Sequence, residues 1–218
     1  MKTLKDQNED NAMPKYDLKQ ELKHLYSPSA KAVEVVEVPP LRYLQISGSG
    51  DPNTAQEYQD AVSTLYSLAY TLKFATKKHE GHDYVVMPLE GLWWVDDLSK
   101  LDMDDKSNWQ WTMMILQPEF VTEAAFESAV SEVRRKKNPP LLDHIRFEEY
   151  HEGQSAQILH IGPYAAEQPT IDCLYAYMQE HGYVHNGRHH EIYLSDPART
   201  APEKLKTIIR QPITLKST

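Results

Sequence analysis

The sequence predicts an α+β fold of two duplicated β-α-β-β halves, related by pseudo-twofold symmetry around a central cleft. Segments with the alternating or continuous apolar pattern of strands are separated by segments with apolar stripes at helical spacing. Short sequences also recur in the same order: residues 44–46 (LQI) resemble 159–161 (LHI), and 65–66 and 174–175 are both Leu-Tyr. Such similarity indicates duplication, although few positions match and chance is the alternative.

The first half is expected to follow a short N-terminal segment. Residues 1–30 are predicted to be a polar tail with a short amphipathic helix, which Leu18, Leu22 and Leu25 mark. Thr54 and Glu57 have the spacing of a capping box, which would start the first long helix. The elements expected in this half are an extended segment over 33–46 that Pro39 and Pro40 interrupt, a helix over 54–72, and strands over 84–95 and 109–117.

A helix over residues 122–137 is expected to link the halves, which span about 31–118 and 141–215 of one domain over 31–218. The elements expected in the second half are extended segments over 141–150 and 154–161, a helix over 170–181 that Gly182 ends, a strand over 189–197, a short helix from Pro202 and a strand over 207–213. A cleft between two halves is a common place for a ligand.

The strand over 189–197 carries the strongest candidate site. Glu191 and Tyr193 alternate with Ile192 and Leu194, so a carboxylate and a phenol are predicted side by side on one face. On a solvent-facing sheet Glu191 would be an ordinary surface charge. In an aromatic cavity, the carboxylate needs a cation, a hydrogen-bond donor or a proton. Four Trp and 13 Tyr, against only four Phe, favour the cavity.

Charge and hydropathy argue against several classes of function. The net charge is -9, so we expect no direct nucleic-acid binding. The basic run at 134–137 closes a predicted helix, where cations suit the helix dipole. No apolar stretch has the length of a membrane span, and the N-terminal segment lacks a hydrophobic signal core. We therefore expect a cytoplasmic protein without membrane contact.

No disulfide, cofactor or metal is expected. Cys173 is the only cysteine, and its apolar neighbours favour a small core residue over a nucleophile. His189 and His190 precede Glu191, but adjacent strand residues face opposite ways and cannot readily share a metal. An HExxH helix and the glycine patterns of nucleotide-binding loops are both absent from the sequence.

Four sequence segments together resemble the GyrI-like small-molecule-binding family. They are PLEGLWW (88–94), WQWTMMILQP (109–118), QILHIGPY (157–164) and HHEIYLSDP (189–197). The resemblance spans roughly residues 33–213 and is greatest to stand-alone bacterial members without a DNA-binding domain. This family shares its fold with the effector-binding domains of BmrR-type multidrug-responsive transcription activators.

The resemblance implies two β-α-β-β (SHS2-like) repeats around an aromatic pocket with a central acidic residue. In drug-binding relatives a glutamate in the position of Glu191 faces lipophilic cations. In GyrI-like hydrolases of cyclopropanoid DNA-alkylating compounds, a glutamate and a tyrosine beside a tryptophan would position water and polarise the electrophile. The expected ligand-binding residues are Glu191, Tyr193, Glu90, Trp93, Trp94, Trp111, Tyr70 and Tyr164.

The resulting hypothesis is a module that binds amphipathic aromatic or cationic small molecules, for sequestration or detoxification of xenobiotics. The alternative is a hydrolase that opens cyclopropanoid or similar electrophilic xenobiotics. In that case Glu191 would be the catalytic general base and Tyr193 a catalytic hydrogen-bond donor. Residue spacing does not separate these two functions. Regulation through contact with a protein partner is a third alternative.

Overall fold

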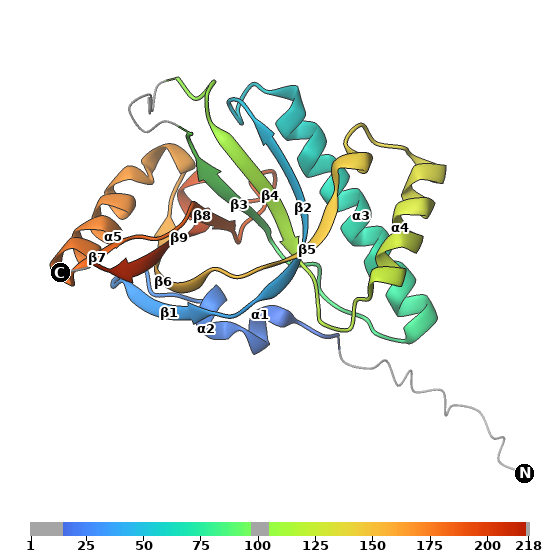
Figure 1. The fold of residues 1–218 in the computed structure, drawn as a ribbon, viewed down its shortest axis with the longest axis horizontal. Helices are drawn as coiled ribbons and strands as arrows, with labels where there is room; N and C mark the ends of the chain where they lie inside the picture. The colour runs from blue at the N-terminus through green and yellow to red at the C-terminus, as the bar shows by residue number, and fades with distance from the viewer. Residues whose placement is uncertain (1–14, 97–104, 217–218) are drawn as a thin grey trace, which may run out of the picture.

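A single antiparallel sheet forms the centre of the computed structural model, which describes residues 15–96 and 105–216 (Figure 1). Within these ranges the sheet has nine strands, eight of them in the order β1-β6-β9-β8-β3-β4-β2-β5, while β7 pairs with β9. The strands are β1 (Glu34–Val38), β2 (Leu41–Ser49), β3 (Leu89–Trp94), β4 (Gln110–Leu116), β5 (Arg146–Tyr150), β6 (Gly153–Ile161), β7 (Tyr183–His185), β8 (His189–Tyr193) and β9 (Lys206–Leu215). The mixed α+β class is therefore as predicted.

Five α-helices and three short 3-10 helices accompany the sheet in the described part of the chain. The α-helices are α1 (Leu18–Glu21), α2 (Lys23–Tyr26), α3 (Gln56–Glu80), α4 (Glu123–Lys136) and α5 (Gln168–Glu180). The 3-10 helices are η2 (Leu142–His144), η3 (Tyr164–Ala166) and η4 (Pro202–Lys204).

The two faces of the sheet are covered by different helices. On one face, called the front face from here on, α3 packs on β2 and β4, and α5 packs on β6 and β9. On the rear face, the backbone carbonyls of His24 and Leu25 in α2 accept hydrogen bonds from β6 and β9. Figure 1 shows α5 toward one end of the sheet and α3 with α4 toward the other. The front of β3 and β8, the two central strands, thus lies between the areas that α3 and α5 cover.

Helix α3 forms because its apolar residues follow the helical repeat. Ala61, Leu65, Leu68 and Leu72 are buried at intervals of three and four, which gives the helix one apolar face. Burying each leucine contributes about 2 kcal/mol. The helix ends at Gly81, whose φ of 76° is a left-handed conformation that a residue without Cβ adopts freely.

Two local sequence predictions are wrong. The N-cap of α3 is Ala55 and no side chain caps it, so the proposed capping box of Thr54 and Glu57 does not form. The backbone N–H groups of Thr54 and Ala55 instead bond to the carbonyl of Asp51, in a turn that precedes the helix. Cys173 is exposed rather than a core residue, because it lies on the outer side of α5.

Two further differences concern the second half. The extended segment expected from residue 141 begins only at Arg146, because residues 142–144 form η2. The short strand β7 was not predicted, and it extends the sheet by pairing with the end of β9. The short helix expected from Pro202 is present, as the 3-10 helix η4. Most of the predicted polar tail lies outside the described residues.

Among the described residues, no helix is long and apolar enough to cross a membrane. The same residues contain no group of three or more His, Cys, Asp or Glu side chains placed to hold a metal ion.

Candidate functional site

Glu191 lies at the centre of the front face, on β8. It is paired with Gly91 of β3 and Ile209 of β9, and its side chain is 16% exposed. Both carboxylate oxygens have partners: the Tyr193 hydroxyl donates to Oε2 at 2.8 Å, and His189 Nε2 lies 3.3 Å from Oε1. The predicted placement of Glu191 and Tyr193 on one face is confirmed, because both side chains meet there.

A hydrogen-bonded chain leads from an indole to this carboxylate. The Nε1–H of Trp93 donates to the Tyr193 hydroxyl at 3.1 Å, and that hydroxyl donates to Glu191. Gly91 makes the arrangement possible, since a Cβ at this position would lie 2.8 Å from Trp93 Nε1. The indole therefore occupies space above residue 91 that any other residue would fill.

Aromatic rings surround the Trp93–Tyr193–Glu191 chain. The ring centroid of Tyr58, on α3, lies 6.0 Å from that of Trp93, and the Trp109 ring lies 5.9 Å from it. From the other side, the ring of Tyr164 in η3 meets Tyr193 edge-on at 5.7 Å. Aromatic faces on both sides of a carboxylate form an environment that attracts cations and flat apolar groups.

The local environment keeps Glu191 ionised. Burial alone would raise the pKa of Glu191, but His189 and the hydrogen bond from Tyr193 outweigh it, and the pKa lies below its ordinary value. Burial and the charge of Glu191 together raise the pKa of Tyr193 well above its ordinary value. Tyr193 therefore remains a hydrogen-bond donor, and Glu191 remains a negative charge among aromatic rings.

Glu90 does not belong to this site, contrary to the sequence prediction. It pairs with Ile192 whereas Glu191 pairs with Gly91, so the two carboxylates point to opposite faces of the sheet. Glu90 is 0% exposed, lies 3.0 Å from His190 and accepts a hydrogen bond from Tyr26 on the rear face. The sequence prediction grouped Glu90 with Glu191 among the ligand-binding residues, but the strand register offsets them by one residue.

Three other predicted ligand residues differ in their placement. Trp94 alternates with Trp93 and lies under Arg188, whose guanidinium carbon is 3.6 Å from the centroid of its ring. Tyr70 is 48% exposed on the outer side of α3, where it stacks between Tyr66 and Phe74. Trp111 is on the front face but fully buried, packed at 5.5 Å against Tyr58.

Tyr58 and Glu167 lie near Glu191 but were not among the predicted ligand residues. Tyr58 lies in the helix expected over residues 54–72, and its ring contacts both Trp93 and Trp111. Glu167 directly follows η3, precedes the first residue of α5 and is buried. No sequence signal indicated this position for Glu167, because it lies in a turn between two helices and belongs to no recognisable motif.

A network of buried charged groups lies directly behind the site, on the rear face. His190 Nε2 is 3.0 Å from Glu90 Oε2, and His190 Nδ1 is 3.0 Å from Glu152 Oε1. Arg210 Nη1 donates to the other oxygen of Glu152 at 3.2 Å. The Tyr26 hydroxyl donates to Glu90 at 2.6 Å. Two acidic and two basic side chains thus meet inside the protein.

The charges of this network set each other's pKa values. Burial would raise the pKa of Glu152, but His190 and Arg210 outweigh it and lower the pKa to about 2. Burial would lower the pKa of His190, but Glu152 and Glu90 raise it to about 9. Near neutral pH, therefore, His190 is a cation between two carboxyl groups.

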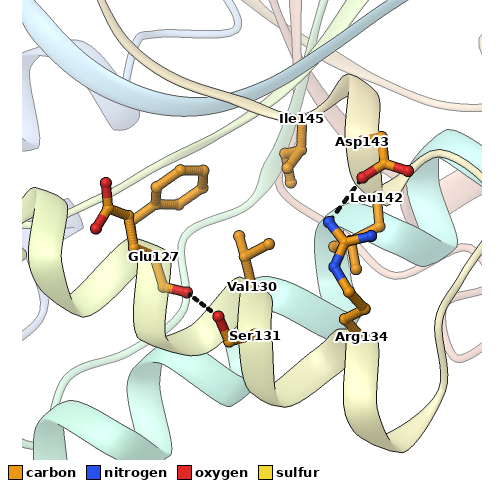
Figure 2. Close-up of a pocket in the computed structure, with 8 residues that line it drawn as sticks. Glu127, Val130, Ser131, Arg134, Leu142, Asp143 and Ile145 are labelled. Atoms are coloured by element: carbon orange, nitrogen blue, oxygen red, sulfur yellow. Dashed lines mark hydrogen bonds and ion pairs between the residues drawn. The ribbon is translucent and has the colours of Figure 1, made fainter.

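A shallow hollow of about 340 Å³ lies away from this site, between α4 and η2 (Figure 2). Phe126, Val130, Leu142 and Ile145 form its apolar part. An ion pair of 2.6 Å between Arg134 and Asp143 crosses one side of it. None of the predicted ligand residues lines this hollow.

Comparisons with known proteins agree on the fold. The profile of the GyrI-like small molecule binding domain matches residues 31–214. An uncharacterized conserved protein from Listeria innocua is 39% identical, with a TM-score of 0.85, over 92% of this chain and 100% of that one. A hydrolase from Listeria innocua is 37% identical over the same shares, with a TM-score of 0.82. The EcmrR C-terminal domain, 11% identical over 85% of this chain and 98% of that one, has a TM-score of 0.53 and shares the fold. No curated protein matches the chain significantly.

Proposed function

Since the chain belongs to the GyrI-like small-molecule-binding family, we propose that it binds amphipathic aromatic or cationic small molecules at Glu191. The observation that carries this proposal is the position of Glu191, an ionised and largely buried carboxylate among aromatic rings. Trp93, Tyr58 and Tyr164 supply these rings from three different elements. Such binding would serve the sequestration or detoxification of xenobiotics.

The energies of such a site favour flat cations. A positive charge about 4 Å from Glu191 would gain about 1 to 4 kcal/mol, depending on how far water is excluded. Each aromatic face in contact with the cation adds about 0.5 to 2 kcal/mol. A neutral compound of the same shape would keep the apolar contacts but lose the charge interaction. Selectivity for the cation is therefore the property to measure.

A pair of fluorescent dyes tests this proposal. Thioflavin T is a flat aromatic cation, and its demethylated benzothiazole analogue is neutral. With Glu191→Gln we expect the affinity for thioflavin T to fall about tenfold or more, which corresponds to about 1.4 kcal/mol. The affinity for the neutral analogue should change little. The matched control is Glu149→Gln, which removes an equal charge from an exposed position on β5.

Either of two results would contradict the binding proposal. One is an equal loss of affinity for both dyes, which would mean that the substitution only disturbs the shape of the site. The other is unchanged affinity for thioflavin T in Glu191→Gln, which would remove the carboxylate from ligand recognition.

The second candidate function is hydrolysis of an electrophilic xenobiotic such as a cyclopropanoid compound. Two observations favour it: a relative 37% identical is a hydrolase, and Glu191 has a hydrogen-bonded tyrosine beside it. Glu191 would take a proton from the attacking water, and Tyr193 would donate a hydrogen bond to the electrophile. Mass spectrometry after incubation with a cyclopropanoid compound measures the addition of one water. Recovery of the intact compound at every protein concentration would exclude this activity.

We also propose that the two halves arose by duplication. Outward from the central β3–β8 pair, the strand order is β4-β2-β5 on one side and β9-β6-β1 on the other. The outermost strand on each side comes from the other half of the chain: β5 lies beside strands of the first half, and β1 lies beside strands of the second half. Superposition of β2-α3-β3-β4 on β6-α5-β8-β9 tests the proposal. It fails if the three strands and the helix do not overlay together.

A further inference from the structure

Glu167 is a buried acid at the start of α5. It is the N-cap residue of α5, yet its side chain makes no capping hydrogen bond. The residue is 6% exposed, and its Oε1 has no hydrogen-bond partner among the described residues. A buried carboxyl group without a partner is costly unless it holds a proton or meets a ligand.

Glu167 belongs to the same front-face site as Glu191. The residue three positions earlier, Tyr164, contacts Tyr193 edge-on. Thr207, which pairs with Tyr193 across β8 and β9, is close to the Glu167 carboxyl but makes no hydrogen bond of ordinary geometry with it. The negative charge of Glu191 acts on Glu167 across the site. The start of α5 therefore brings a second carboxyl group to the Trp93–Tyr193–Glu191 chain.

The surroundings of Glu167 favour its neutral form. Burial and then repulsion by Glu191 raise the pKa of Glu167 to about 8, while Thr207 and Lys106 oppose this more weakly. The titratable or charged groups near it on the packed elements are Glu191 and Tyr193 of β8, Tyr164 of η3, His160 of β6 and Lys106 before β4. One carboxyl of the pair is thus protonated and the other ionised near neutral pH, which is the arrangement of an acid and a base.

We propose that Glu167 is the acid of this site, which protonates the leaving atom of a bound electrophile while Glu191 accepts a proton from the attacking water. The inference rests on the hydrolytic candidate and adds to it the residue that would complete the reaction. Tyr193 is a poor acid in comparison, because burial and the charge of Glu191 raise its pKa well above the ordinary value, so its hydroxyl group keeps its proton.

The proposed step balances as follows. The water oxygen forms a bond to the electrophilic carbon, and the proton it loses passes to Glu191. The bond between that carbon and the leaving atom breaks, and its electron pair stays on the leaving atom, which takes the proton of Glu167. The sum is the addition of one water across the broken bond. A proton then passes from Glu191 to Glu167 through solvent, which restores both groups.

This chemistry selects a class of substrate. A proton donor accelerates only those reactions in which the leaving atom would otherwise depart as a strong base. The aromatic walls select a flat aryl group next to the reacting carbon. The predicted substrates are therefore aryl-bearing strained electrophiles with a basic leaving oxygen, of which styrene oxide is the simplest probe. A benzylic chloride, para-nitrobenzyl chloride, needs the same attack by water but no proton on the leaving atom.

The two probes separate the roles of the two acids. In Glu167→Gln, a neutral isostere that cannot give up a proton, we expect hydrolysis of styrene oxide to slow about 100-fold or more. Hydrolysis of para-nitrobenzyl chloride should change less than about threefold, since chloride leaves without a proton. Glu191→Gln should slow both reactions. Glu180→Gln, at the exposed far end of α5, is the matched control.

The pH dependence provides a readout that a purely structural role would not change. For the wild-type protein the rate with styrene oxide should fall as pH rises through about 8, because Glu167 loses its proton. The rate with the chloride should show no such fall. Equal slowing of both probes in Glu167→Gln, or unchanged hydrolysis of styrene oxide, would overturn the inference. Failure of the wild-type protein to hydrolyse either probe would also overturn it, while thioflavin T binding would still stand as a test of the binding function.

Discussion

His190 carries a positive charge in the folded protein, so we expect the free energy of unfolding to fall as the pH becomes alkaline. Its two ring nitrogens lie 3.0 Å from Glu90 and 3.0 Å from Glu152, and the pKa rises from 6.5 to about 9. The folded protein therefore holds this proton more tightly than the unfolded chain does. The resulting stabilisation is complete below about pH 6.5 and is lost as pH rises through about 9. The pKa difference corresponds to about 3 kcal/mol.

Urea unfolding between about pH 6 and pH 10 measures this contribution. Other groups titrate over part of this range, so the useful quantity is the difference between wild-type protein and His190→Gln. Glutamine has a similar size and hydrogen-bonding capacity but carries no charge. We expect the stability advantage of the wild-type protein over this variant to shrink by about 3 kcal/mol across the range.

The control for this measurement is His151→Gln, a histidine that is exposed and lies next to Glu152 in sequence. It should leave the pH dependence unchanged. If the difference between wild-type protein and His190→Gln stays constant across the range, His190 is not a buried cation and the reasoning about the rear-face network is refuted.

Three further predictions concern single positions. Gly91→Ala should push the Trp93 indole away, because the new Cβ would lie 2.8 Å from its Nε1. Thioflavin T affinity should then fall several-fold and the free energy of unfolding by about 1 to 3 kcal/mol; unchanged affinity would contradict this. Glu167→Gln should raise the free energy of unfolding by about 3 kcal/mol at about pH 7. The raised pKa of Glu167 gives the wild-type protein stability below about pH 4.5 that is lost as pH rises toward 8, whereas glutamine does not titrate; equal urea midpoints at pH 7 would contradict this. Gly48→Ala should destabilise the fold by about 1 to 3 kcal/mol or more in the same assay, since its Cβ would meet the buried Trp111 ring at 2.3 Å, and a neutral result would show that this ring can move.

Much of the fold could be predicted from the sequence because apolar periodicity reports burial directly. The stripe of α3 corresponds to side chains that are buried against the sheet, and the alternation in β8 corresponds to alternating half-buried and buried side chains. The start of α3 was mispredicted, because Thr54 and Glu57 fit a capping box equally well whether or not the preceding turn supplies the bonds. Here the carbonyl of Asp51 already accepts the two N–H bonds, and the pattern alone does not show this.

The sequence predicted the part of the candidate site whose residues lie on one strand. It did not predict the part that depends on how neighbouring strands are paired. Alternation along β8 sufficed to place Glu191 with Tyr193. The position of Glu90 depends on which residue of β3 lies opposite Glu191, and a shift by one residue reverses the face of every side chain. Glu167 approaches from a different element altogether, so only the packing of α5 brings it to the site.

The register of β8 links the two sides of the sheet. A slip by one residue would turn Glu191 into the rear-face network and bring His190 to the front, where the aromatic rings of the site would surround it. In the observed register, His190 lies between Glu90 and Glu152 with each ring nitrogen 3.0 Å from a carboxylate oxygen, and Arg210 completes the charge balance. Breaking a buried pair of this kind leaves an uncompensated charge and destabilises a protein by several kcal/mol, commonly about 3 to 5. The rear-face network therefore disfavours the slipped register, and it holds Glu191 in the position where Tyr193 can reach it.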